Sequence, residues 1–225
     1  MPKLREFREP FSSISKLLAI SSIIMTQVTI DSTHSTASHG HEEHPDFRTL
    51  GLLTFLISES LMFGALFATY LFLRGITPEF PPKETEVELL IPSINTIILV
   101  SSSFVIHKGD VAIKQNDVKG MRLWYSITAL MGAIFLGGQV YEYLNLGYGL
   151  TTNTFSNCFY MMTGFHGLHV FIGLLLILGV LWRSRRPDHY SATKHTGIEM
   201  AEIYWHFVDI IWIILFALLY ILTQF

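Results

Sequence analysis

Cysteine is almost missing from this chain of 225 residues, which has Cys158 alone. A single cysteine cannot form an intrachain disulfide, and it excludes the CxxC motifs of zinc and redox sites. Charge is scarce as well. Asp, Glu, Lys and Arg make up 15% of the residues, and a soluble domain has about 25%. Because half of the residues are hydrophobic, the composition indicates a membrane protein, and the net charge of −3 gives no reason to expect a nucleic-acid partner.

Five apolar runs divide most of the chain. A helix that crosses a bilayer core needs about 20 apolar residues. In hydrocarbon every backbone polar group needs an internal partner, so these runs are predicted to be α-helices. The predicted spans are 49–73, 92–111, 121–143, 155–182 and 201–223. The expected fold class is therefore all-α, a polytopic membrane protein with a five-transmembrane-helix bundle in residues 49–225.

Residues 1–48 are predicted to be a polar, partly disordered N-terminal tail. They contain one weakly apolar segment, Leu17–Ile30, which is too short to span a membrane. This segment is typical of an interfacial helix, of a signal-peptide core, or of an extension upstream of a start at Met25. The Ser- and His-rich stretch that follows has the composition of a disordered segment.

Lysine and arginine are distributed unevenly between the connections. One side of the membrane would hold Arg48, Lys108, Lys114, Lys119, Arg122, Arg183, Arg185, Arg186 and Lys194. The other side would hold Arg74 and Lys83. Since cytoplasmic loops carry the excess of Lys and Arg, we expect the N-terminus in the cytoplasm and the C-terminus outside.

Glu59 is the residue that does not belong in the first apolar run. It lies near the middle of residues 49–73, which contain no Lys or Arg. A carboxyl group at that depth costs about 2.5–3.5 kcal/mol or more, so it should face protein. Without a nearby cation it should be largely protonated, because desolvation penalises the charged form. Both a functional carboxyl and a packing residue fit this position.

The last two spans contain further polar residues. His166 and His169 are three residues apart and share a helix face, and Glu202, His206 and Asp209 form a polar stripe. Hydrogen bonds between helices are the ordinary role of such groups. Haem or copper ligation needs two ligands on facing helices or a cluster of three. Two histidines three apart on one helix cannot clamp a haem from opposite faces, so we expect no metal or cofactor in this chain.

Three stretches carry a resemblance to a known family. TGFHGLHVFIG at 163–173 and EIYWHFVDIIW at 202–212 resemble the two most diagnostic stretches of cytochrome c oxidase subunit III. FLISESLMFGALFATY, around Glu59, resembles the helix of that family which bears a buried glutamate reactive with carbodiimide. The resemblance runs from about Arg48 to the C-terminus, and five helices are similar to the shorter bacterial form.

The resemblance implies an accessory subunit of a proton-translocating respiratory oxidase, with no active site or redox centre of its own. Its partners would be subunit I in direct contact, subunit II and membrane phospholipid, with haem and copper in the partner subunits. It would support the stability of subunit I and proton uptake during electron transfer to O2, in a bacterial plasma membrane or another energy-transducing membrane. Glu59 would be the buried carboxyl, and the polar core would be His166, His169, Glu202, His206 and Asp209. Arg48 and Arg183, at cytoplasmic helix ends, would contact lipid head groups.

Two other functions fit parts of the pattern. Subunit III of a quinol oxidase is also a five-helix chain, and its electron donor is chosen by another subunit. A proton-coupled transporter would use Glu59 and Asp209 as carriers. Transporter folds usually contain repeats and helices broken at mid-membrane, and the sequence shows neither.

Overall fold

The computed structural model of this chain describes residues 47–85, 88–187 and 189–224. The predicted tail, residues 1–48, falls almost entirely outside the described residues, as does its apolar segment. The described part is helical and has five helices long and apolar enough to cross a membrane, so the predicted fold class is confirmed. They are α2 (Phe47–Ile76), α3 (Leu90–Lys114), α4 (Val118–Asn145), α5 (Thr154–Arg183) and α6 (Thr196–Phe216).

Helices α2 to α5 each contain their predicted apolar run and extend beyond it at both ends, whereas the last run, 201–223, is covered by α6 together with the two turns that follow it. The ends are stabilised by polar residues that the hydropathy pattern does not weigh. Asp117 caps α4 by accepting a hydrogen bond from Gly120 N (2.9 Å), and Asn153 forms a capping box with Ser156 at the start of α5. Helix α6 continues as a π-helical turn, Ala217–Ile221, and a 3-10 turn, Leu222–Gln224.

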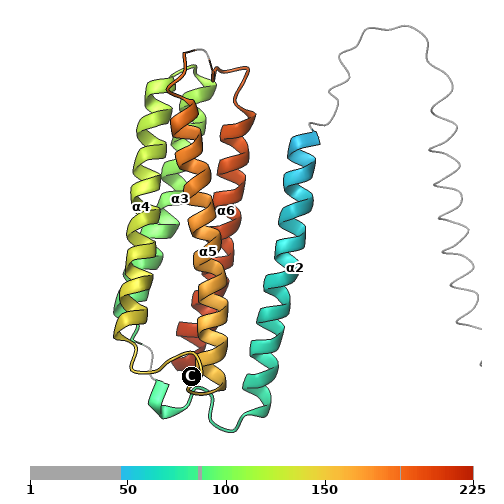
Figure 1. Cartoon of the computed structure of the whole chain (residues 1–225), viewed down its shortest axis with the longest axis vertical. Helices are drawn as coiled ribbons and strands as arrows, with labels where there is room; N and C mark the ends of the chain where they lie inside the picture. The colour runs from blue at the N-terminus through green and yellow to red at the C-terminus, as the bar shows by residue number, and fades with distance from the viewer. Residues whose placement is uncertain (1–46, 86–87, 188, 225) are drawn as a thin grey trace, which may run out of the picture. The chain divides into compact units, whose positions relative to one another are not determined.

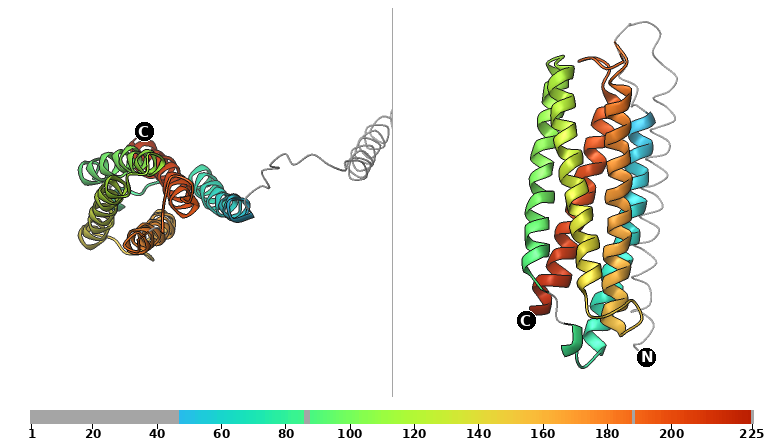
Figure 2. Two further views of the ribbon diagram at one scale, coloured as in Figure 1. Left: turned by 90° about the horizontal axis from the view of Figure 1, so that it is seen from above. Right: turned by 60° about the vertical axis from the view of Figure 1, so that its left-hand side comes forward.

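Helices α3, α4, α5 and α6 form a four-helix ring in that order, closed by the contact of α6 with α3 (Figures 1 and 2). Helix α2 lies outside this ring, alongside α5 and α6. Residues 115–117 and 184–195 connect the ring helices at the end where α2 begins. We name this the basic end, because Lys114, Lys119, Arg122 and Arg183 lie there, and the opposite end the far end.

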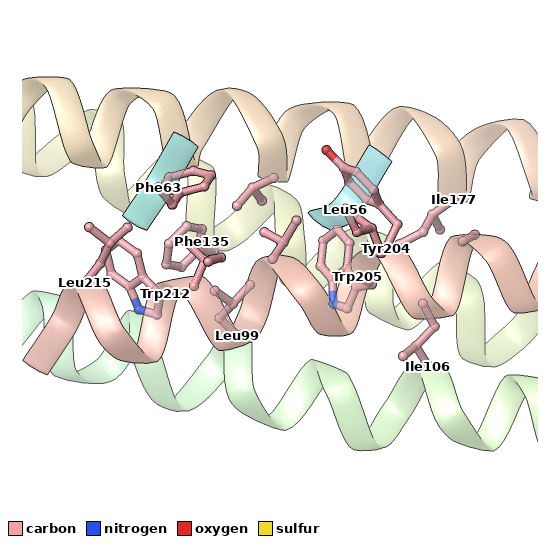
Figure 3. Close-up of a cluster of buried hydrophobic side chains, with 14 of the residues drawn as sticks. Leu56, Phe63, Leu99, Ile106, Phe135, Ile177, Tyr204, Trp205, Trp212 and Leu215 are labelled. Atoms are coloured by element: carbon pink, nitrogen blue, oxygen red, sulfur yellow. The ribbon is translucent and has the colours of Figure 1, made fainter. Parts of the chain in front are cut away.

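Large aromatic side chains of α6 fill the centre of the ring. Trp205 and Trp212 are fully buried, and Figure 3 shows them among aliphatic and aromatic residues of the surrounding helices. Each indole N–H has a partner: Trp205 donates to Ser102 Oγ (2.8 Å) and Trp212 donates to Thr96 Oγ1 (3.0 Å), both on α3. The α3–α6 contact therefore combines aromatic packing with satisfied polar groups.

Glycine makes room for Trp205 on the helix across the ring. A Cβ atom at Gly132 of α4 would lie 2.5 Å from the edge of the Trp205 ring, closer than real carbon atoms approach each other. Gly137, on the same helix, has open space around it. The fit of Trp205 against α4 thus depends on a missing side chain at Gly132, as in other membrane bundles.

Helix α2 is much less buried than the ring. Of the residues in its most apolar stretch, 11% are buried, whereas the corresponding share is 28–39% in the other four spans. Its buried side chains are Leu56, Phe63 and Tyr70, which lie about two turns apart on one face. The rest of α2 presents exposed apolar side chains, which suit lipid or a neighbouring subunit.

We predict that Gly132→Ala destabilises the assembled protein by about 1–3 kcal/mol, because the new methyl group displaces Trp205 from a well-packed core. Gly137→Ala is the matched control, and it should leave stability unchanged or raise it by about 0.5–1 kcal/mol. Thermal unfolding of the purified protein in detergent measures both. Equal behaviour of the two variants would contradict the packing account.

Candidate functional site

Glu59 forms a hydrogen-bonded pair with His169 across the α2–α5 contact. Glu59 Oε2 lies 3.1 Å from His169 Nε2, and the side chains are 19% and 8% exposed. The pair connects the outer helix to the ring in the apolar part of the span. Phe63, one turn along α2 from Glu59, covers the imidazole in an edge contact with ring centroids 5.1 Å apart.

The second imidazole nitrogen decides how many protons the pair holds. His169 Nδ1 lies 2.7 Å from the carbonyl oxygen of Phe165, one turn earlier in α5. A carbonyl oxygen only accepts, so Nδ1 carries a hydrogen. Nε2 is then either bare, with a protonated Glu59 donating to it, or protonated, with a carboxylate accepting from it. In both forms one proton lies between the two side chains.

The far end of α2 is held by two hydrogen bonds to the last residues of the chain. Tyr70 OH donates to the carbonyl of Leu218 (2.9 Å), and Arg74 Nη2 donates to the carbonyl of Leu222 (2.9 Å). The last carbonyl groups of a helix lack intrahelical partners, and the π-helical turn that follows α6 presents Leu218 to α2. Helix α2 is thus attached to α5 at mid-length and to the end of the α6 segment.

The polar stripe of α6 faces α3 and not Glu59. Ser103 Oγ of α3 donates to Asp209 Oδ2 and lies 3.0 Å from His206 Nδ1. His206 Nε2 lies 3.4 Å from Glu202 Oε1, and that oxygen lies 2.9 Å from His107 Nδ1. The predicted polar residues of α6 therefore belong to a chain of polar contacts along the α3–α6 contact, separate from the glutamate–histidine pair.

His166 occupies a third location, inside the ring. Its ring stacks on Trp212 (centroids 4.9 Å apart) and meets the edge of Phe135 (5.9 Å). Neither nitrogen of His166 has a hydrogen-bond partner among the described residues, although the side chain is fully buried. The two histidines of α5 therefore contact different neighbours, and they are not placed to bind one ligand together.

Comparison with known proteins identifies the relatives of this arrangement. A family model described as cytochrome c oxidase subunit III matches residues 9–224. A protein of Thermostichus vulcanus named cytochrome c oxidase subunit 3 is 74% identical, over 88% of this chain and all of the relative. One from a Synechocystis strain is 58% identical, over 86% of this chain and 84% of the relative, and one from a Bacillus strain is 38% identical, over 77% and 84%.

The chain belongs to the cytochrome c oxidase subunit III family. It is accordingly a membrane subunit of a respiratory haem–copper oxidase, and the resemblance predicted from the sequence is confirmed.

Arg48 and Arg183, the predicted lipid contacts of this family member, lie at the basic end. Arg48 is exposed in the first turn of α2. Arg183 closes α5 and lines a groove of about 330 Å³ with apolar residues of α2, α5 and α6, among them Leu52 and Leu176. Its Nε donates a hydrogen bond to His189 Nε2 (3.1 Å). Desolvation and the positive charge of Arg183 lower the pKa of His189. The positive charge beside the groove is therefore that of the arginine.

The sequence did not predict several residues that make polar contacts between the helices. Ser103 connects Asp209 to His206, yet serine in an apolar run carries no charge signal. Tyr70 and Arg74, near the end of the first span, were not assigned any partner from the sequence. At the far end, Glu142 accepts hydrogen bonds from Tyr220 OH (2.9 Å) and Gln139 Nε2 (3.1 Å), a contact that required knowing that α4 and the end of α6 meet.

We predict that Tyr70→Phe loosens α2 by removing the donor to Leu218, at a cost of about 0.5–1.5 kcal/mol. Tyr141→Phe, at an exposed tyrosine of α4, is the control and should cost nothing. Limited proteolysis in the connection after α2, residues 77–89, measures the loosening. Cleavage that is as slow in Tyr70→Phe as in the control would show that this hydrogen bond does not hold the helix.

Proposed function

We propose that this subunit III is an accessory subunit without a redox centre, and that it supports proton uptake by the oxidase through the Glu59–His169 pair. The observation that carries the proposal is the hydrogen-bonded contact of the half-buried Glu59 with the buried His169, between the loosely packed α2 and the ring. A proton shared by a carboxyl and an imidazole can be lost and regained without large movement.

Burial favours one of the two protonation forms of the pair. A carboxylate beside an imidazolium places two charges in the apolar part of the span, and desolvation penalises both. The uncharged form, a carboxylic acid donating to bare Nε2, avoids that cost and keeps both hydrogen bonds of His169. We therefore assign the proton to Glu59 in the resting state.

The partners follow from the same contacts. The exposed apolar side chains of α2 and α5 suit contact with subunit I, the haem- and copper-bearing subunit, with subunit II completing the complex. Haem ligation by this chain is disfavoured, because His166 lies between two aromatic rings and both nitrogens of His169 are engaged. The names of the relatives favour cytochrome c as the electron donor over quinol. A dinuclear copper site in the associated subunit II would test that choice.

Orientation and location are part of the proposal. The basic end carries most of the Lys and Arg residues of the connections, which supports a cytoplasmic position for it and an outside position for the far end. A bacterial plasma membrane, or another energy-transducing membrane, is the location that suits such an oxidase.

Glu59→Gln tests the role of the shared proton. The amide N–H2 donates to His169 Nε2 as the carboxylic acid does, so we predict normal assembly with the haem-containing subunit. The amide has no proton to give up, so we predict slower proton uptake and faster loss of activity during turnover. Stopped-flow proton uptake and the number of turnovers before inactivation are the measurements.

Ser60→Ala is the matched control for this experiment. Ser60 is the next residue of α2, and its hydroxyl donates only to the carbonyl of Leu56 in the same helix (2.7 Å). The variant should behave as wild type in both measurements. An assembled Glu59→Gln oxidase with wild-type uptake and wild-type lifetime would refute the proposed use of the proton.

Phospholipid binding at the basic end is the second part of the proposed role. The apolar groove closed by Arg183 has space for an acyl chain with an anionic head group beside the arginine, and Arg48 is exposed at the same end. We predict that replacing both arginines with Gln lowers the acidic phospholipid that co-purifies with the oxidase. Arg185→Gln is the control, since Arg185 is exposed and does not line the groove. Lipid extraction and mass spectrometry provide the comparison, and an unchanged acidic lipid content would contradict this assignment.

A further inference from the structure

Three side chains from two helices bring metal-binding atoms together near the basic end. His107 and Asp110 lie one turn apart on α3, and Glu202 faces them from α6. One ligand atom from each residue lies within 4.8 Å of the other two. Around a tetrahedral zinc ion, ligand atoms about 2.0–2.2 Å from the metal lie about 3.3–3.6 Å apart, so the most distant pair of this set must approach by up to about 1.5 Å to bind one ion.

The burial of these residues shows both a prepared site and an entrance. The side chains of Asp110 and Glu202 are 3% and 11% exposed, and that of His107 is 63% exposed. An ion can therefore enter past His107 and reach two carboxylates that are already held in place. His206 supplies a possible fourth ligand, because its Nε2 lies 3.4 Å from the Glu202 oxygen that meets His107.

An unpartnered oxygen is the second observation that points to a ligand. Asp110 Oδ1 is buried and has no hydrogen-bond partner, although Oδ2 accepts from Lys114 Nζ (2.7 Å). A buried carboxylate oxygen without a donor is costly, and a cation or water commonly resolves such a case. Within the described part of the chain, Lys114 is the one lysine or arginine paired with these two carboxylates, so negative charge remains for a divalent ion.

We propose that His107, Asp110 and Glu202 form a binding site for a divalent transition metal, with zinc as the ion that suits them best. Imidazole and carboxylate ligands are characteristic of zinc sites, and a three-residue set leaves a fourth position for His206 or water. Binding at Nδ1 requires the His107 tautomer that carries its hydrogen on Nε2, since the metal takes the lone pair on Nδ1. The bound ion links α3 to α6 at the His107 end of their chain of polar contacts.

Lys114 gives the proposal a distinctive consequence. Its ammonium group neutralises Asp110 and competes with the metal for that carboxylate. The lysine side chain is 52% exposed and also approaches Glu199 (3.8 Å), so it has another partner when an ion arrives. Removing the ammonium group should therefore strengthen zinc binding, whereas removing His107 should weaken it.

Zinc binding to the purified oxidase, with this chain at full length, tests the site. The complex is stripped with chelator, dialysed against graded Zn²⁺, and its zinc measured by mass spectrometry relative to haem. We expect His107→Gln and Asp110→Asn each to lose one zinc per complex, with affinity lower by about 10–100-fold. Lys114→Gln should bind zinc more tightly than wild type. His107 is exposed, so its replacement should leave the haem content of the complex unchanged.

His189→Gln is the matched control, because His189 lies outside the spans and contacts Arg183 instead of the three proposed ligands. It should keep the full zinc content. Zinc bound by histidines elsewhere in the complex is the same in every variant, so it does not affect the difference between variants. Zinc X-ray absorption should show nitrogen and oxygen ligands at about 2.0–2.2 Å, a feature that His107→Gln diminishes. Equal zinc content in wild type and His107→Gln would overturn the proposal, as would an equal loss in His189→Gln.

Discussion

The attachment of α2 to the helix ring is the constraint on which the rest of the structure depends. Four helices share an aromatic core centred on Trp205 and Trp212, but α2 contributes few buried side chains to it. In a membrane, apolar contact with protein gains little over apolar contact with lipid, so polar links decide where such a helix lies. The Glu59–His169 pair and the hydrogen bonds of Tyr70 and Arg74 are those links.

This attachment explains why a carboxyl group is kept in an apolar span. A charged residue would cost several kcal/mol at this depth, and a carboxylic acid hydrogen-bonded to imidazole avoids most of that cost. The same arrangement leaves one exchangeable proton between an outer helix and a packed ring. Structural retention of Glu59 and functional use of its proton are therefore compatible, because one hydrogen bond serves both.

The fold could be predicted almost entirely from the sequence, and the site only in part. Five apolar runs and the scarcity of charge determine the helices, because hydrocarbon allows no other use of such segments. The place of Glu59 followed from the same argument, but its partner did not. Both Glu59 and His169 lie well inside their apolar runs, and only the neighbour relation of α2 and α5 shows that they meet.

The histidines of α5 show why spacing alone misplaces a polar core. Residues three apart on a helix differ in direction by about 60°. That difference directs His166 into the ring, against Trp212, and His169 outward to Glu59. In the same way, Glu202 and Asp209 were predicted to form one polar core with His166 and His169, but α6 turns them toward Ser103 and His107 of α3. The helix order around the ring, which the sequence does not encode locally, decides each partner.

Infrared spectroscopy of the purified oxidase with isotope-labelled glutamate tests the central claim, that Glu59 carries the proton of the pair. The difference between wild type and Glu59→Gln isolates the carboxyl group of Glu59. The account predicts that the variant loses a C=O stretching band of a protonated carboxylic acid, shifted by the label and sensitive to His169→Phe. Loss of a carboxylate band in its place would contradict the claim.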